Sequence, residues 1–252
     1  METNHQSLVE WLPGFFQQWP ENVLTSNEPT NTEQIVIDVD QFRAFLNRLT
    51  TPLQAVQHNV LSFDPWDIAG LKRNEVRNSS VLAWLLNPEG SHGFDAIPLN
   101  ALLALSRTSK KEFFPASFMR YCRVQVETNP VGDSKNRVDI EIDADNFFLL
   151  IEVKIGAFEQ DKQIERYCSD AEKKAGGRPW GVVFLTPNGR QPVSSGSNNH
   201  HISCLSWRHL AREMEGDMHK AYQKAVAVHP ASPMKQIAAH AAFCFIERMH
   251  QF

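Results

Sequence analysis

The chain has 252 residues, of which 42% are hydrophobic, and a formal net charge of −4 at pH 7. This length suits one good-sized domain with an appendage, and the acidic total excludes a strongly basic protein that coats nucleic acid. The four cysteines lie far apart without CxxC spacing, which indicates reduced thiols rather than a disulfide framework or a zinc site. Neither a signal-peptide pattern nor a run of about 20 apolar residues is visible. We therefore expect a cytoplasmic protein with no membrane partner.

The first 65 residues are predicted to form a helical N-terminal extension to a main domain over residues 66–252. Residues 8–24 have an aromatic helix pattern with breaks at Pro13 and Pro20, and a second helix pattern runs from Asp40 to Leu61. Pro52 is expected to kink or break that second helix. We expect the extension to pack on the main domain or on a second subunit, or to dock a partner protein.

The main domain shows helix and strand patterns in an order typical of an α/β fold. Asn74 suits the N-cap of a helix that ends before Asn87-Pro88. A strand–helix–strand run after residue 147 implies a right-handed parallel crossover. Predicted helices cover residues 74–86, 96–105, 158–174, 207 onward and 233–249, and predicted strands cover 121–127, 137–143, 147–154, 180–185 and 202–205. We therefore expect a mixed central sheet, an antiparallel three-stranded meander plus a parallel strand, flanked by helices.

Two neighbouring predicted strands carry acidic residues, with Asp139 thirteen residues before Glu152. A two-residue turn at Asp145-Asn146, a pair that tolerates positive φ, sets Asp139 directly opposite Glu152. Side chains alternate along a strand. One face of the hairpin is therefore apolar and buried: Val138, Ile140, Ile142, Phe147, Leu149, Ile151 and Val153. The other face gathers polar residues: Asp139, Glu152 and Lys154, with Arg137, Glu141 and Asp143 further along.

Two carboxylates held face to face repel each other, and an unpaired buried charge is costly. A divalent cation between Asp139 and Glu152 removes that repulsion, and oxygen ligands of this kind suit Mg²⁺ or Mn²⁺. The alternative is a pair of surface strands with a salt bridge from Lys154 to one of the acids. The facing acids, the apolar reverse side and the helix that follows at once favour the catalytic interpretation.

These residues resemble the PD-(D/E)XK nuclease superfamily, whose shared core is a helix, a three-stranded meander, a helix and a strand. The likeness extends over residues 70–210, and Val138 stands where the family name has Pro. Glu75, the LAWLLNP stretch that ends at Pro88, and His92-Gly93 resemble the first helix of a bacterial branch, in which an acid opens the helix. Gln163 and Tyr167 resemble a Q-x-x-x-Y element, and residues 184–189 resemble the next strand and its exit.

The resemblance implies a restriction-endonuclease-like fold and metal-dependent phosphodiester hydrolysis. Asp139, Glu152 and the carbonyl of Val153 would hold Mg²⁺ or Mn²⁺. Lys154 would orient the attacking water or help to deprotonate it. Glu75 would reach the metal through water or complete a second site.

Gln163 and Tyr167 point the same way on their predicted helix because they are four residues apart. Gln163 can hydrogen-bond the attacking water, a phosphate or Glu152, and Tyr167 can contact a nucleic-acid backbone. The alternative for both is a polar pair in a seam between helices. For Glu127 and His92 we favour a solvated acid and a turn residue, respectively.

Basic residues near the proposed cleft are expected to give a local phosphate-binding surface despite the negative total charge. The alternative is that they are solvated helix faces, which any soluble domain has. They are Lys72, Arg73, Arg77, Lys135, Arg137, Lys162 and Arg166.

The sequence thus predicts a Mg²⁺-dependent nuclease acting on DNA, in a bacterial or phage-related setting such as defence against phage or mobile elements, the last step by analogy alone. Nucleic acid is the expected partner, with a homodimer or a partner protein contacting the N-terminal helices. One alternative is a binding or sensing module that keeps the nuclease fold without cleavage, which the acidic total favours. Another is an RNA-cleaving enzyme, because a metal and a lysine act on phosphate and do not inspect the sugar.

Overall fold

The computed structural model describes residues 38–57, 63–109, 115–128, 130, 137–193, 199–228 and 232–252. The chain divides into two compact units, Met1–Leu61 and Ser62–Phe252. In the first unit the helix α2 (Val39–Gln57) continues past Pro52, so it is not broken there, and the kink named as the other outcome stays a prediction. The aromatic pattern over residues 8–24 lies outside the described residues.

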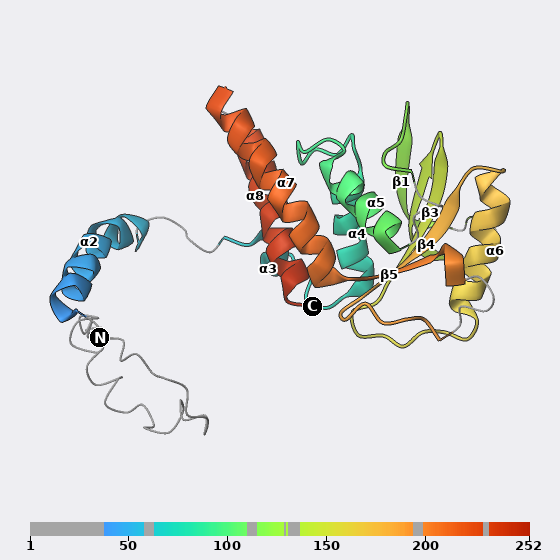
Figure 1. The fold of residues 1–252 in the computed structure, drawn as a ribbon, viewed down its shortest axis with the longest axis horizontal. Coiled ribbons are helices and arrows are strands. Elements are labelled where there is room, and N and C mark those ends of the chain that lie inside the picture. Colours follow the sequence, from blue (N-terminus) through green and yellow to red (C-terminus); the bar gives the residue numbers. More distant parts are fainter. Residues whose placement is uncertain are drawn as a thin grey trace, which may run out of the picture. The chain divides into compact units, whose positions relative to one another are not determined.

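A five-stranded mixed sheet forms the centre of the second unit, in the order β1-β2-β3-β4-β5 (Figure 1). The strands β1 (Cys122–Thr128), β2 (Val138–Ala144) and β3 (Phe147–Val153) form the antiparallel meander. The strands β4 (Trp180–Thr186) and β5 (Ile202–Ser206) extend it in parallel. The predicted mixed sheet is confirmed, and its parallel part contains two strands.

The β2–β3 hairpin has the predicted register. Ala144 pairs with Phe147 and Ile140 with Ile151, so the connection is the two residues Asp145 and Asn146. Neither turn residue adopts the positive φ that an Asp-Asn pair tolerates. Side-chain bonds hold the turn instead: the Asp145 carboxylate accepts from the backbone N–H groups of residues 119 and 120, and the Asn146 amide donates to the carbonyl of residue 117.

Helices cover both faces of the sheet (Figure 1). One face carries α6 (Gln163–Ala175), which contacts β3 and β4. The other carries α4 (Glu75–Leu86) against β1 and β2 and α5 (Ile97–Ser109) against β5. Behind these lie α7 (Trp207–Val228), α8 (Pro233–His250) and the short α3 (Pro65–Ile68). A 3-10 turn, η1 (Asn199–His201), leads into β5.

Every residue of β3 is buried, and successive side chains enter different cores. Phe147 and Leu149 pack in the cluster beneath α4, α5 and α7, whereas Phe148 and Leu150 pack beneath α6. Val138 belongs to the α6-side cluster, not to the face it was expected to share with Ile140. The polar face of the hairpin is therefore partly covered by α6, so that Glu141 and Glu152 are buried while Asp139 and Asp143 are half-buried.

The helix α6 begins at Gln163, five residues later than predicted, because Lys162 before it is in the left-handed region with φ 51°. It ends as expected at Gly176, which is left-handed as well and terminates the helix at no steric cost. None of the helices in the described part of the chain is long and apolar enough to cross a membrane.

Candidate active site

The site lies at the open end of the β2–β3 hairpin. Continuing the observed register by one residue beyond Ile140 and Ile151 sets Asp139 opposite Glu152, as predicted. Oδ2 of Asp139 accepts a hydrogen bond from the backbone N–H of Val153 at 2.8 Å. The carboxylate thus replaces the backbone carbonyl that would accept this hydrogen bond in a continuous β-sheet, at the point where β2 and β3 separate. No hydrogen bond from a described residue reaches its other oxygen, Oδ1.

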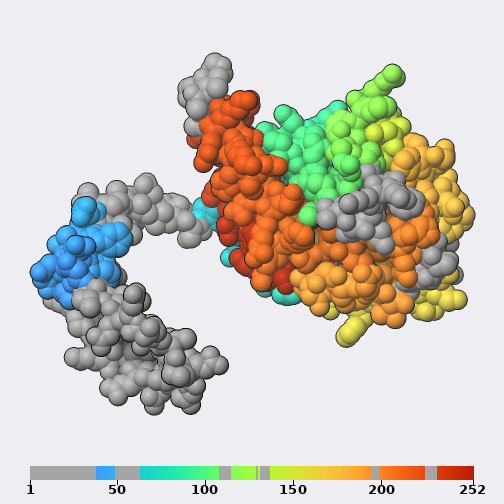
Figure 2. All heavy atoms as spheres, in the orientation of Figure 1, coloured from blue at the N-terminus to red at the C-terminus, as the bar shows by residue number. Residues whose placement is uncertain are grey.

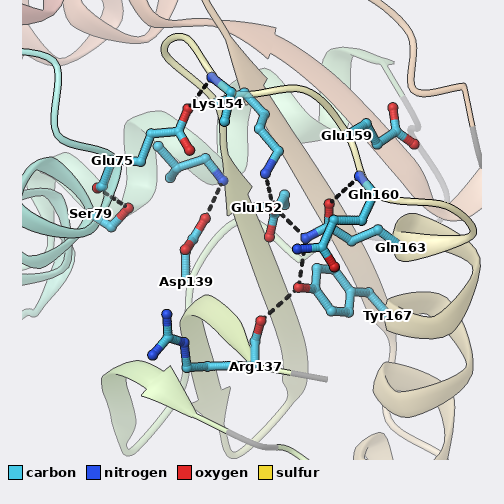
Figure 3. A network of polar contacts seen from close by, with 12 residues as sticks. Glu75, Ser79, Arg137, Asp139, Glu152, Lys154, Glu159, Gln160, Gln163 and Tyr167 are labelled. Carbon is cyan, nitrogen blue, oxygen red and sulfur yellow. Dashed lines mark hydrogen bonds and ion pairs between the residues drawn. The ribbon is translucent and has the colours of Figure 1, made fainter. Parts of the chain in front are cut away.

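Glu152 and Lys154 form a buried ion pair (Figure 3). The Nζ atom of Lys154 lies 2.6 Å from Oε1 of Glu152, and the two residues are 8% and 2% exposed. The predicted convergence of Asp139, Glu152 and Lys154 is therefore present in the structure. The same oxygen of Glu152 accepts from Nε2 of Gln163 at 2.8 Å, which is one of the three partners expected for this glutamine.

Burial raises the pKa of Glu152 to about 8, and the nearby Asp139 carboxylate adds to the shift while Lys154 opposes it. Burial raises the pKa of Asp139 too, against the hydrogen bond from Val153 and the charge of Lys154. Burial by itself would lower the pKa of Lys154, but the contact with Glu152 raises it. Because it is unfavourable for both facing carboxylates to be ionised at once, a bound cation would stabilise this site.

Glu75 lies at the start of α4, where Asn74 caps the helix by accepting from the N–H of Arg77. Its Oε1 accepts three backbone N–H groups, from Ile155, Gly156 and Ala157, at 2.8, 3.0 and 2.9 Å. Burial would raise the pKa of Glu75, but these bonds and Lys154 lower it. Glu75 therefore fixes the segment that follows Lys154. Its expected role at a metal stays a prediction.

The structure contradicts the contact with a nucleic-acid backbone that was expected of Tyr167. Its side chain is 2% exposed, and its hydroxyl accepts from Gln163 and donates to the carbonyl of Arg137 at 2.7 Å. A buried hydroxyl with both partners inside the protein is not placed to contact a nucleic-acid backbone. The seam proposed as the alternative is the better description, although the seam joins α6 to β2. Through it α6 holds Gln163 against Glu152.

The donors around the hairpin fit a divalent cation. Oδ1 of Asp139 and the second oxygen of Glu152 are hard ligands from facing strands, and the carbonyl of Val153 lies between Glu152 and Lys154 in the chain. In the part of the chain that the structure describes, no group of three or more His, Cys, Asp or Glu residues forms a protein-only cage. Two carboxylates with remaining positions for water and phosphate suit Mg²⁺, which keeps several waters.

The expected phosphate-binding residues are spread over several elements, and some have partners inside the protein. Arg73 donates to the carbonyl of Ile155 at 3.0 Å, and Arg77 donates to carbonyls of the loop before α4. Arg137 lies 3.3 Å from Glu127 in an exposed ion pair. Lys72 and Lys162 are exposed, Arg166 is half-buried, and Lys135 lies outside the described residues. Their role toward nucleic acid stays a prediction.

His92 is a structural residue, as favoured. It is buried, its Nδ1 accepts the N–H of Phe94 at 3.0 Å, and its Nε2 therefore carries the proton shared with the carbonyl of Asn87 at 2.9 Å. The sequence did not reveal Trp207, whose Nε1 donates to the carbonyl of Lys154 at 3.2 Å. Trp207 is 53 residues away in sequence from Lys154, and no local pattern predicts such a bond.

A family model for the PD-(D/E)XK nuclease superfamily matches residues 63–241, and the chain belongs to this superfamily. The matched residues lie within the second unit of the chain and include the hairpin, α4 and α6. Neither the curated proteins nor the solved structures contain a significant match.

Proposed function

We propose that this protein is a nuclease that hydrolyses phosphodiester bonds of DNA with Mg²⁺ or Mn²⁺ held by Asp139, Glu152 and the Val153 carbonyl. The observation that carries the proposal is the cluster of half-buried Asp139 with buried Glu152 and Lys154, in which the lysine nitrogen lies 2.6 Å from Glu152. A bare binding module has no need to bury two repelling carboxylates beside a lysine, because that arrangement costs stability.

A divalent cation bound there would polarise the scissile phosphate and activate a water molecule. Lys154 supplies a positive charge on the side of Glu152, where it orients the attacking water and offsets the charge that grows on the phosphate. Gln163 holds Glu152 in place by its 2.8 Å bond, so the carboxylate does not rotate away when Lys154 turns to the substrate. Asp139 is held in the same way by the N–H of Val153.

The setting and the assembly of this enzyme are proposed from resemblance. The stretch from Glu75 to Gly93 is similar to a bacterial branch of the family, which suggests defence against phage or mobile elements. Free thiols at all four cysteines suit a cytoplasmic enzyme. A homodimer through residues 1–65 would place two active sites on one duplex, so that both strands are cut.

The test is a cleavage assay on supercoiled plasmid, single-stranded DNA and RNA, with Mg²⁺, with Mn²⁺ and with EDTA. Wild type is expected to cut DNA only with a metal. Asp139→Asn and Lys154→Met should lower the rate by a factor of about 10² or more, as losing a transition-state contact does. Lys173→Met, on the exposed side of α6, is the matched control and should cut normally.

Cleavage by both active-site variants at the wild-type rate, with their fold intact by circular dichroism, would remove the proposal. RNA cleavage that depends on the same two residues would keep the chemistry and change the substrate. Binding of nucleic acid without any cleavage under these conditions would favour the sensing module.

A further inference from the structure

A cavity of about 670 Å³ lies beside the candidate active site, between the connection from β3 to α6 and the connection from β4 to β5. The two segments, residues 158–165 and 190–193, run next to each other on the surface (Figure 2, gold and orange). The cavity adjoins the catalytic group: the N–H of Gln160, in its lining, donates to Oε1 of Gln163, whose Nε2 bonds Glu152. A cavity of this size can take one nucleotide.

The walls of the cavity are held in place by Glu159. Its side chain is only 4% exposed, and its Oε2 accepts the N–H of Val193 at 2.8 Å and lies 3.5 Å from the Arg190 guanidinium. Arg190 in turn lies over the ring of Phe184, 5.1 Å from its centroid. These contacts tie the two connections together, so the cavity is formed before anything binds. Preformed walls keep the cost of ordering a ligand low.

The charges around the cavity favour an uncharged occupant over a phosphate. Three carboxylates line it, from Glu159, Asp161 and Glu165, against two cations, Lys162 and Arg190. Since Arg190 is already paired with Glu159, the remaining balance is acidic. A phosphate group would be repelled, whereas an uncharged group with donors along its edge would find acceptors.

Phe158 gives the cavity an aromatic surface. Its side chain is 94% exposed, and it follows Lys154 by four residues. A flat ring left in water beside hydrogen-bonding carboxylates matches the two surfaces of a nucleobase, its π face and its polar edge. The phosphate attached to such a base would lie toward Glu152 and Lys154.

We infer that this cavity binds an unpaired nucleobase next to the scissile phosphate, stacked on Phe158. A base inside a duplex cannot reach the cavity, so the substrate must be single-stranded there or have one nucleotide turned out of the stack. The inference rests on the proposed function and deepens it, since it names the form of nucleic acid that the site accepts.

The first experiment measures stacking without cleavage. A single-stranded DNA oligonucleotide that contains 2-aminopurine is titrated in EDTA with wild type, Phe158→Ala and Phe158→Trp. Wild type and the tryptophan variant should quench the 2-aminopurine, and Phe158→Ala should bind about tenfold or more weakly, the usual loss when one base–aromatic stack is removed. Because Phe158 is exposed, its variants should keep the wild-type unfolding midpoint.

Met119→Ala is the matched control. Met119 is a large exposed apolar residue, 74% accessible, and its N–H bonds Asp145 at the turn end of the β2–β3 hairpin, away from the site. This variant should bind like wild type. A second experiment compares single-turnover cleavage of the single strand with that of its blunt, fully paired duplex, and wild type should prefer the single strand more strongly than Phe158→Ala does.

Unchanged quenching and affinity in Phe158→Ala, or no response of 2-aminopurine to wild type, would overturn the inference. So would an equal preference of wild type and Phe158→Ala for the single strand over the duplex. If cleavage still depends on Asp139 and Lys154 in that case, the proposed function stands without the base pocket. Conversely, quenching that requires Phe158 in a protein that cuts no nucleic acid would keep the pocket and remove the nuclease.

Discussion

The carboxylate of Glu75 can either position residues 155–157 or bind the metal, and the two roles predict different effects of substitution. One oxygen already accepts three N–H groups of residues 155–157, which the amide oxygen of a glutamine can also do. If Glu75 only positions the segment after Lys154, Glu75→Gln should keep the cleavage rate within about tenfold, whereas Glu75→Ala should lose about 10²-fold through misplacement of the lysine.

The measurement is kcat together with the Mg²⁺ concentration at half-maximal rate. A positioning role leaves the Mg²⁺ dependence of Glu75→Gln unchanged. A shift of that dependence to much higher Mg²⁺, with the fold intact, would instead make Glu75 a ligand of the metal. Ser80→Ala, on an exposed part of the same helix, should match wild type in both quantities.

His92 should make the stability of the protein depend on pH. Burial lowers the pKa of His92 from its ordinary 6.5, although the Asn87 carbonyl and Asp95 oppose the shift. The unfolded chain therefore takes up this proton first, so the stabilisation from neutral His92 is complete above pH 6.5 and falls as the pH drops below it. Protonation would also place an N–H against that of Phe94.

The free energy of unfolding in urea checks this at pH 7.5 and at acidic pH for wild type and His92→Gln. The variant should be less stable by about 1–3 kcal/mol at pH 7.5, since two hydrogen bonds are altered. The gap should narrow on acidification, because only wild type loses the His92 contribution. A constant gap would contradict the prediction. Met119→Ala, which replaces an exposed residue that does not titrate, should show no such pH-dependent difference.

At the scale of elements, one face of α6 packs along the polar side of the hairpin. Gln163 and Tyr167 meet the site end, Lys174 pairs with Glu141 at 2.6 Å, and Arg178, just after the helix, pairs with Asp143 at 2.7 Å. The acids expected to share one face of the hairpin are thus divided: Asp139 faces the site, while Glu141 and Asp143, further along, pair with basic residues in and just after α6.

Removing Lys174 should therefore leave a buried carboxylate without its cation. Glu141 is almost fully buried and retains only the hydroxyl of Thr128 as a donor among the described residues. Lys174→Met is expected to lower the free energy of unfolding by about 2 kcal/mol, less than for a fully buried pair because Lys174 is partly exposed. Adding Glu141→Gln should recover part of the loss.

Chemical denaturation of the two single variants and the double variant gives the coupling energy directly. Lys173→Met provides the control, because Lys173, the neighbour of Lys174 in α6, is exposed, and this substitution should cost less than about 0.5 kcal/mol. Simple additivity of Lys174→Met and Glu141→Gln would show that the pair contributes nothing beyond its separate parts.

The hairpin was predictable from the sequence because the position of the turn determines which residues of the two strands pair. Once Asp145 and Asn146 are the turn, alternation fixes which side chains face each other, and the structure keeps that register. The start of α6 was not predictable, since it depends on Lys162 adopting a positive φ that sequence patterns disfavour. The burial of Tyr167 could not be foreseen either, because it follows from where α6 lies on the sheet.

At the scale of the whole molecule, the site is assembled from segments that are distant in sequence. Arg73, just before α4, and Glu75, its first residue, hold residues 155–157, and Trp207 from the start of α7 holds the carbonyl of Lys154. The sequence predicted the acids and the lysine because they share one hairpin. It could not predict these supports, because they depend on tertiary packing.

The division of the chain predicts that the second unit folds by itself. Its cores and all the supports of the site lie within Ser62–Phe252, and the family match falls inside the same range. A chain that begins at Ser62 should unfold in one cooperative transition. Its midpoint should lie within about 4 °C of the corresponding full-length transition, the shift that about 1 kcal/mol gives at this size.

The same shortened chain tests whether the N-terminal extension is needed to cut both strands. If residues 1–61 join two copies, the shortened protein should be a monomer by light scattering and should nick supercoiled plasmid without linearising it, because one active site cuts one strand at a time. Full-length protein should linearise the plasmid with a rate that rises with protein concentration. Linear product from the monomeric shortened chain at an equal rate would contradict pairing through the extension, since a single site would then cut both strands unaided.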